Sequence, residues 1–244
     1  MKVNMKKTLV SSAVAGALMV GTAGFSTAKA ELEFNVGVFS DYILWGTSAS
    51  GNNAVVQGGI DYGHESGFYL GVWTSSLGGT VYEPVFDEDG NLEDLDVLVA
   101  EGQEVDLYFG YEFEAGGLDF DVGYVYYYYP SLGDFDLDYG DIYGSVGYGP
   151  VYFSANYAIH ADDSDYEGSY VLAIGGGYEI MPSISLDGEL GYTKQKFDGG
   201  DDTWTFWSLG LTKSTSMGDI SLTYAQTDES DLDPLFVVGY SISF

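Results

Sequence analysis

Four carboxylates around one short turn have the clearest chemical meaning in this sequence. Glu112 and Glu114 precede residues 115–117, and Asp119 and Asp121 follow them. Side chains at alternate positions of a β-strand share one face, so a hairpin here places the four carboxylates together. Like charges directly opposite one another in a hairpin are destabilising. We therefore expect this cluster to bind cations or to hold a proton on one carboxyl group.

Further carboxylates occupy the polar face of similar alternating segments. In a barrel with its polar faces inward, a ring of Asp and Glu without basic partners is typical of a cation-preferring pore. The competing interpretation is a wetted rim whose acidity reflects a salty habitat or serves solubility. The candidate pore-lining residues are Glu33, Asp61, Glu104, Asp106, Glu112, Glu114, Asp119, Asp121, Asp187 and Glu189, with Glu189 one step deeper than the group at the mouth.

Twelve segments that alternate apolar and polar residues must position these carboxylates. In residues 104–114, for example, Leu107, Phe109 and Tyr111 share the face opposite Asp106, as a strand with one apolar side requires. The expected strands are 32–40, 54–62, 68–76, 104–114, 118–129, 139–147, 151–160, 169–178, 184–193, 203–212, 220–227 and 235–244. Long connections (41–53, 77–103) alternate with short ones (63–67, 115–117), which is typical of outer-membrane barrels with short periplasmic turns.

The first thirty residues have the layout of a cleavable secretory signal. Lysines at positions 2, 6 and 7 precede an apolar stretch, which ends at Ala28-Lys29-Ala30 before Glu31. Beyond residue 30 no run of about 20 apolar residues could form a membrane-spanning helix. We therefore predict a signal peptide over 1–30 and a single domain over 31–244.

The charge balance of the predicted mature chain excludes several classes of protein. Lys194, Lys196 and Lys213 are its only basic residues apart from two histidines, and all 38 carboxylates lie in it, so its formal charge is −35. Such a chain repels nucleic acid and anionic surfaces. Its 22 tyrosines argue against disorder. Because it has no cysteine, the fold must hold by packing and backbone pairing.

Strand patterns alone do not separate a soluble β-sandwich from a membrane barrel, but two features favour the barrel. The last strand ends the chain on an aromatic residue, with apolar residues at every second position, as in the C-terminal signal read by the barrel insertion machinery: Phe236, Val238, Tyr240, Ile242 and Phe244. Aromatic residues also crowd the strand ends, as interfacial girdles require. They are Tyr62, Phe68, Tyr69, Trp73, Phe113, Tyr124, Tyr126, Tyr128, Tyr148, Tyr170, Tyr178, Tyr192, Trp204 and Trp207.

A family resemblance supports the same fold. The segments Val38-Phe39-Ser40-Asp41-Tyr42 and Gly46-Thr47-Ser48, followed by residues 54–62 and 66–73, resemble the TorF porin family of proteobacteria. The match is close over the first fifty residues or so of the mature chain. Members of that family usually carry an Arg where this chain has Trp45. The resemblance implies an all-β, antiparallel, up-and-down transmembrane barrel and a role in passive transport.

An acidic stretch in the second long connection is a weak metal-site candidate. Oxygen ligands at alternate positions suit Ca²⁺ or Mg²⁺, but Leu92 and Leu98 stand where an EF-hand loop needs its Gly and its closing Glu, so we reject that motif. Looser divalent binding and a solvated acidic loop both remain interpretations. No other cofactor is expected. The candidate ligands are Asp87, Asp89, Asn91 and Glu93.

Two rival functions compete with a pore. A barrel hydrolase needs a general base, and only His64, in a predicted turn, and His160, predicted inward beside Asn156, are available. A non-conducting structural or partner-binding barrel needs no open lumen, and inward tyrosines such as Tyr108 and Tyr127 would favour it. The preferred hypothesis is a bacterial outer-membrane channel for small, cationic solutes or ions. Its other predicted partners are outer-membrane lipid, lipopolysaccharide and the insertion machinery.

Overall fold

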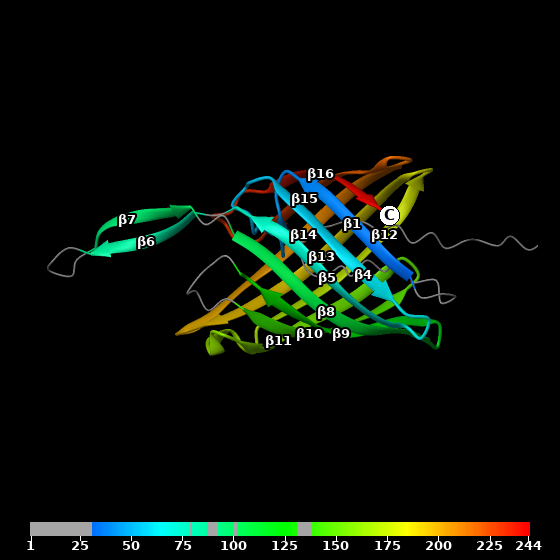
Figure 1. The fold of residues 1–244 in the computed structure, drawn as a ribbon, viewed down its shortest axis with the longest axis horizontal. Helices are drawn as coiled ribbons and strands as arrows, with labels where there is room; N and C mark the ends of the chain where they lie inside the picture. The colour runs from blue at the N-terminus through cyan, green and yellow to red at the C-terminus, as the bar shows by residue number, and fades with distance from the viewer. Residues whose placement is uncertain (1–30, 79, 87–91, 100–101, 131–137) are drawn as a thin grey trace, which may run out of the picture.

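Twelve antiparallel strands close into a barrel in the computed structural model, which describes residues 31–78, 80–86, 92–99, 102–130 and 138–244 (Figure 1). The predicted signal peptide lies outside the described residues. The barrel strands are β1 (Glu31–Phe39), β4 (Val55–Gly63), β5 (Phe68–Leu77), β8 (Gly102–Ala115), β9 (Leu118–Tyr128), β10 (Tyr139–Tyr148), β11 (Val151–Ala161), β12 (Tyr170–Met181), β13 (Ile184–Phe197), β14 (Gly200–Thr215), β15 (Gly218–Thr227) and β16 (Leu235–Ser243). The predicted fold class and strand number are confirmed.

The first and last strands close the barrel. β1 pairs antiparallel with β16, and the backbone N–H groups of Phe34 and Phe244 each donate to the other residue's carbonyl oxygen at 3.0 Å. The two aromatic rings stack with centroids 5.9 Å apart. Closure pairs the backbone groups that a sheet edge would leave unsatisfied in hydrocarbon.

The two faces of the barrel wall have the chemistry that the alternation predicts. On β8, Leu107 and Phe109 have 45% and 52% of their surface exposed on the outside, while Asp106 and Tyr108 are buried inside. On β13, Leu186 and Leu190 lie outside and Asp187 inside. The apolar outer surface suits lipid, and the polar inner surface forms the lumen.

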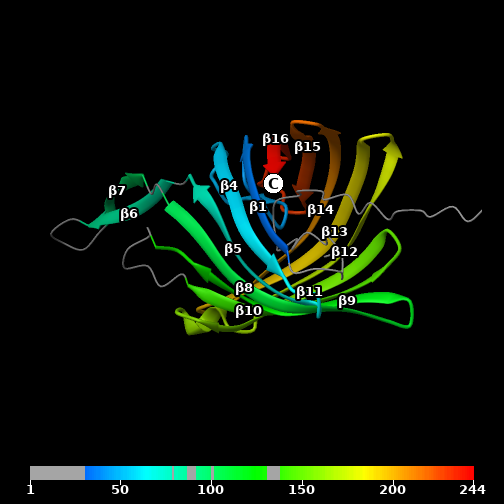
Figure 2. The same cartoon turned by 45° about the vertical axis from the view of Figure 1, so that its right-hand side comes forward.

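Two small hairpins and one long hairpin differ from the expected strands. β2 (Ile43–Leu44) pairs with β3 (Thr47–Ser48), and β6 (Thr80–Phe86) pairs with β7 (Leu92–Val99), both within predicted loops. In the view of Figure 2 the β6–β7 hairpin lies beyond the barrel wall. β13 and β14 continue to residues 197 and 200, so a two-residue turn replaces a predicted connection over 194–202. In the described part of the chain, no helix is long and apolar enough to cross a membrane.

Three aromatic residues assigned to the girdles point into the barrel instead. Tyr69 and Trp204 are buried, and Trp73 packs against Tyr42 with ring centroids 5.6 Å apart. Their strand neighbours explain the error, because Phe68 and Leu70 occupy the outer face around Tyr69. Strand ends thus carry aromatic residues on both faces, and the girdle prediction counted both. The structure also shows which face the aromatic residues of β10 and β14 occupy. Tyr139, Tyr143 and Trp204 lie inside the barrel, and Trp207 lies outside.

Candidate functional site in the barrel lumen

The connection between β1 and β4, residues 40–54, folds into the barrel; we call it loop 1. Its local fold is organised by the buried carboxylate of Asp41, whose Oδ1 accepts hydrogen bonds from the Tyr42 N–H (2.8 Å) and from the hydroxyls of Ser48 and Ser50 (both 2.6 Å). Trp45 adopts a left-handed backbone conformation with φ of 50° at the tip of the β2–β3 turn. A short internal hydrogen-bond network therefore holds the loop in a fixed shape.

Loop 1 reaches two sides of the lumen. On one side the Tyr42 hydroxyl donates to Glu104 Oε1 of β8 at 2.7 Å. On the other side Trp45 packs among buried residues of β12 and β14, and its carbonyl oxygen accepts from Trp204 Nε1 at 2.9 Å. The loop thus crosses the bore at the end of the barrel that carries the long connections, here called the loop end. The end with the short turns and the described chain termini is the turn end.

Tyrosine hydroxyls are the main hydrogen-bond donors to the lumen carboxylates. Tyr69 donates to Asp121 Oδ1 at 2.8 Å, Tyr129 to Glu104 Oε2 at 2.9 Å, and Tyr152 to Glu189 Oε2 at 2.6 Å. Tyr108 also donates to Asp61. A phenol satisfies a carboxylate's hydrogen bond without supplying a positive charge, so these pairs hold the acids in place and bring no basic partner into the lumen.

The carboxylates predicted near one mouth lie at the turn end. Strand register sets Glu112 directly opposite Asp121, and Glu114 opposite Asp119. It also sets Glu33 of β1 opposite Asp61 of β4. Their exposure grows toward the mouth, where Glu114 and Asp119 are exposed. Asp187 and Glu189 lie on β13 of another part of the wall, with Asp187 buried.

A second acidic group lies deeper, beneath loop 1. Glu104 and Asp106 of β8 are 2% and 5% exposed. Asp141 of β10, 4% exposed, joins them at this level but was absent from the sequence-based candidates. Its strand carries tyrosines and glycines on both faces, so its register could not be read from the sequence. The sequence analysis also missed the tyrosine donors as site residues. The composition held a signal for them, because a chain with 22 tyrosines and no arginine has few other donors for buried carboxylates.

The three lysines of the described chain all lie on the outer side of the wall. Lys194 forms a 2.6 Å ion pair with Asp201 and lies between Tyr170 and Tyr192. Lys196 donates to the Glu167 carbonyl oxygen at 2.5 Å, and Lys213 pairs in register with Ile184 and Ile220. Every charged side chain that the described strands direct into the lumen is therefore acidic.

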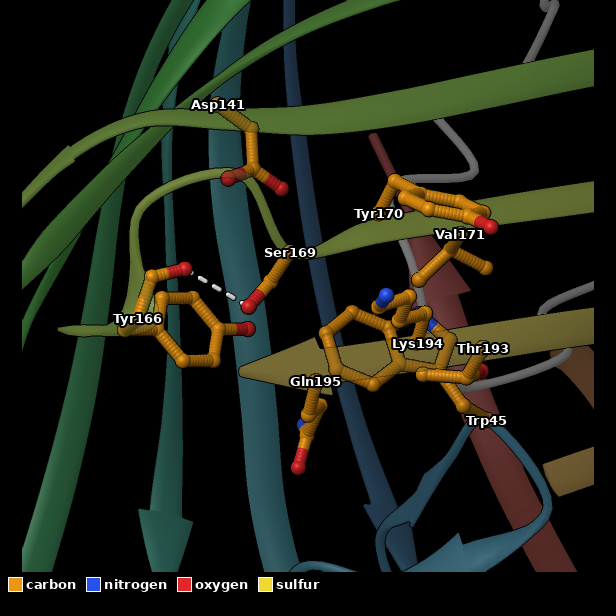
Figure 3. Close-up of a pocket in the computed structure, with 9 residues that line it drawn as sticks. All are labelled: Trp45, Asp141, Tyr166, Ser169, Tyr170, Val171, Thr193, Lys194 and Gln195. Atoms are coloured by element: carbon orange, nitrogen blue, oxygen red, sulfur yellow. Dashed lines mark hydrogen bonds between the residues drawn. The ribbon is translucent and has the colours of Figure 1, made fainter. Parts of the chain in front are cut away.

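A pocket lies between Trp45 of loop 1 and the barrel wall (Figure 3). The Asp141 carboxylate points into it, and Tyr166 and Ser169, joined by a 2.6 Å hydrogen bond from the serine hydroxyl to the tyrosine carbonyl oxygen, close one side. Thr193 lines the opposite side and is fully buried. The side chains meet so closely that no water-sized space is left between them. Trp45 therefore packs tightly against this side of the bore.

The histidines do not meet in a catalytic arrangement. His160 was predicted inward beside Asn156, and this is wrong. A bulge between β10 and β11 at Gly140/Asp141 turns it to the outer face, where its Nε2 lies 2.5 Å from the Tyr124 hydroxyl. His64 lies in an exposed turn, with its Nδ1 2.9 Å from Ser66 Oγ.

The candidate metal ligands Asp87, Asp89 and Asn91 fall outside the described residues, and Glu93 lies in β7. Within the described residues, no group of three or more His, Cys, Asp or Glu side chains is arranged to hold a metal ion.

A closed, twelve-stranded antiparallel barrel with lipid-type residues outside and a polar lumen defines the outer-membrane β-barrel class. The chain belongs to the family described as "Bacterial protein of unknown function (Gcw_chp)", whose model matches residues 23–237. The TorF name from the sequence resemblance stays a prediction. No curated protein matches the chain.

Two solved barrels are similar in fold. The KdgM porin, solved in complex with disordered oligogalacturonate, aligns with a TM-score of 0.50 at 8% identity, over 87% of this chain and 97% of that one. The COG4313 outer membrane channel from Pseudomonas putida F1 aligns with a TM-score of 0.50 at 13% identity, over 88% of this chain and 96% of that one. At these identities the likeness concerns the fold.

Proposed function

We propose that this protein is a bacterial outer-membrane channel through which small cations pass passively. The observation that carries the proposal is the one-signed lumen: β8, β9 and β13 direct carboxylates inward, whereas the three lysines face outward, where Lys194 pairs with Asp201. Rings of Asp and Glu with low-dielectric walls concentrate cations and repel anions. In this assignment the turn end faces the periplasm and the loop end faces the outside.

The solute class follows from the same charge. Oligogalacturonate, which the KdgM porin binds, is a polyanion, and a lumen lined by Asp121, Glu189 and their neighbours would repel it. Twelve strands also enclose less space than the wide channels of sixteen-stranded porins. The lumen chemistry therefore favours small cations.

The test is single-channel recording of the refolded protein in planar bilayers, with the reversal potential measured across a KCl gradient. We expect discrete steps and a reversal potential on the cation side, which moves toward zero in the triple variant Glu112→Gln, Asp119→Asn, Asp121→Asn. The matched control, Asp165→Asn, Glu229→Gln, Asp231→Asn, removes the same charge from exposed loops and should leave selectivity nearly unchanged. Anion preference, or equal shifts in both variants, would contradict the proposal.

A non-conducting, partner-binding barrel is the second candidate, and the tight packing of loop 1 inside the bore favours it. The same recording separates the two functions. A correctly folded barrel that gives no current under any applied voltage would replace the channel by this alternative.

A further inference from the structure

One row of inward residues across three neighbouring strands consists of a tyrosine, a glycine and a carboxylate. Register sets Tyr152 of β11 opposite Gly175 of β12, and Gly175 opposite Glu189 of β13. The Tyr152 hydroxyl donates to Glu189 Oε2 at 2.6 Å. A Cβ on Gly175 would lie 2.5 Å from that hydroxyl oxygen and 2.6 Å from Cζ of the same ring. The ring therefore lies over the glycine, along the barrel wall, and crosses the middle strand to reach the carboxylate.

The same row of residue types recurs in another part of the wall. Register sets Tyr108 of β8 opposite Gly71 of β5, and Gly71 opposite Asp61 of β4. Tyr108 again donates to the carboxylate at the far end of the row. The three atoms nearest to a Cβ on Gly71 all belong to the Tyr108 side chain, with Cε2 at 2.6 Å. The two rows thus share their order of residues, their hydrogen bond and their close approach.

Two further tyrosines lie over a pair of glycines. Register aligns Tyr69 of β5, Gly110 of β8, Gly123 of β9 and Tyr143 of β10 in one row. The Tyr69 ring covers Gly110, the Tyr143 ring covers Gly123, and the two hydroxyls meet between them. Tyr69 also donates to Asp121 at 2.8 Å. These rings, too, follow the wall.

Glycine is needed in the middle of each row because it alone leaves room for a ring so close to the backbone. Any other residue adds a Cβ, and such atoms essentially never lie within 3.0 Å of another heavy atom in proteins. Glycine inside a strand marks a site where another group approaches the backbone closely. Inward tyrosines are expected to favour a non-conducting barrel when they fill the bore, but a ring that lies along the wall extends less far toward the centre.

We propose that Gly71 and Gly175 are positioning residues of the channel, which hold the rings of Tyr108 and Tyr152 against the wall and out of the path of the solute. This inference rests on the proposed channel and names residues that set its width. Tyr152 and Gly175 are half-buried, whereas Tyr108 is 7% exposed. The row through Gly175 therefore borders the accessible part of the lumen and should control the width more strongly.

The test is a double-mutant cycle on the refolded mature barrel. Single-channel conductance in planar bilayers and the urea midpoint of unfolding are measured for each variant. Gly175→Ala forces the ring off the wall, so we expect the midpoint to fall and the conductance to fall roughly twofold or more. In the Tyr152→Ala background no ring is displaced, and the same substitution should leave both quantities nearly unchanged. The Gly188 carbonyl oxygen, 3.0 Å from the same Cβ position, is present in both backgrounds and cancels in the cycle.

The matched control is Gly177→Ala on the same strand. Gly177 pairs in register with Asp187 on the inner face, and its Cβ would have no atom closer than 3.4 Å. This variant should conduct and unfold like wild type. If Gly175→Ala fails to fold, Gly71→Ala with Tyr108→Ala gives the same cycle at a position where the ring alone is in the way.

The two measurements separate this inference from the channel proposal, because the urea midpoint needs no conduction. Coupling between the two substitutions in the midpoint, with no current from wild type, overturns the channel and leaves the position of the ring standing. Cation current that Gly175→Ala leaves unchanged, or lowers equally with and without Tyr152, overturns this inference and leaves the channel standing.

Discussion

The two ends of β8 carry the same pattern of acids and differ in everything around them. Near the loop end, Glu104 and Asp106 are buried under loop 1. Near the turn end, Glu112 is half-buried and Glu114 is exposed. The alternation is identical, so the strand itself does not cause the difference. One connecting segment that folds inward buries the acids of the loop end, where tyrosine hydroxyls contact Glu104.

This contrast assigns different tasks to the two halves. Exposed carboxylates at the turn end act through a field that salt screens within about 8 Å at physiological ionic strength. Buried carboxylates at the loop end are screened much less and act on a solute in direct contact. In the proposed channel, the turn end would attract cations through its field and the loop end would contact them directly.

The largest expected effect comes from removing the side chain that anchors loop 1 against β12 and β14. Trp45→Ala deletes the indole packed against Val171 and Phe206, so we expect a several-fold rise in single-channel conductance. We also expect the free energy of unfolding to fall by about 3–5 kcal/mol, measured by urea titration of the refolded barrel. Trp207→Ala, on the outer face, is the control. If both variants conduct like wild type, loop 1 does not close the bore.

The origin of this contrast shows where sequence-based inference succeeds and stops. Period-two alternation gave the twelve strands and the inner position of Asp106 and Asp187, because one face of every strand meets lipid. Alternation carries no information on where a connection folds. Residues 41–53 were therefore expected only as a long loop, although Asp41, Ser48 and Ser50 organise it internally.

Register errors have a different cause. The bulge at Gly140/Asp141 adds one residue to β11 and turns His160 outward, and a bulge of this kind leaves no mark in the hydrophobic pattern. Asp141 was missed for a related reason, since tyrosines and glycines suit either face of a wall. The alternation predicted the correct face for acidic residues flanked by aliphatic residues or phenylalanine. It did not predict the face for acidic residues on strands rich in tyrosine and glycine.

A smaller perturbation of the same loop tests whether its contact with the wall matters. Gly46 has φ of 81°, and a Cβ there would lie 2.6 Å from Phe206 Cβ and 3.0 Å from Thr227 Cγ2. Gly46→Ala should therefore push loop 1 away from the wall and raise conductance, though less than Trp45→Ala. Gly116→Ala, at φ of 65° in a turn with nothing within 4 Å, carries similar backbone strain of about 1–2 kcal/mol without the clash. A rise in conductance in both variants would point to strain rather than displacement.

The smallest effect is expected at the open end, and its salt dependence is informative. Glu114→Gln removes one exposed carboxylate from the mouth, so cation conductance should fall about twofold or less in dilute KCl. At about 1 M KCl, where screening acts within roughly 3 Å, the difference from wild type should vanish. Asp106→Asn, buried beneath loop 1, should keep its effect on the reversal potential at both concentrations. Because these two carboxylates lie on one strand and differ strongly in burial, equal salt sensitivity would mean that the loop end is as wet as the turn end.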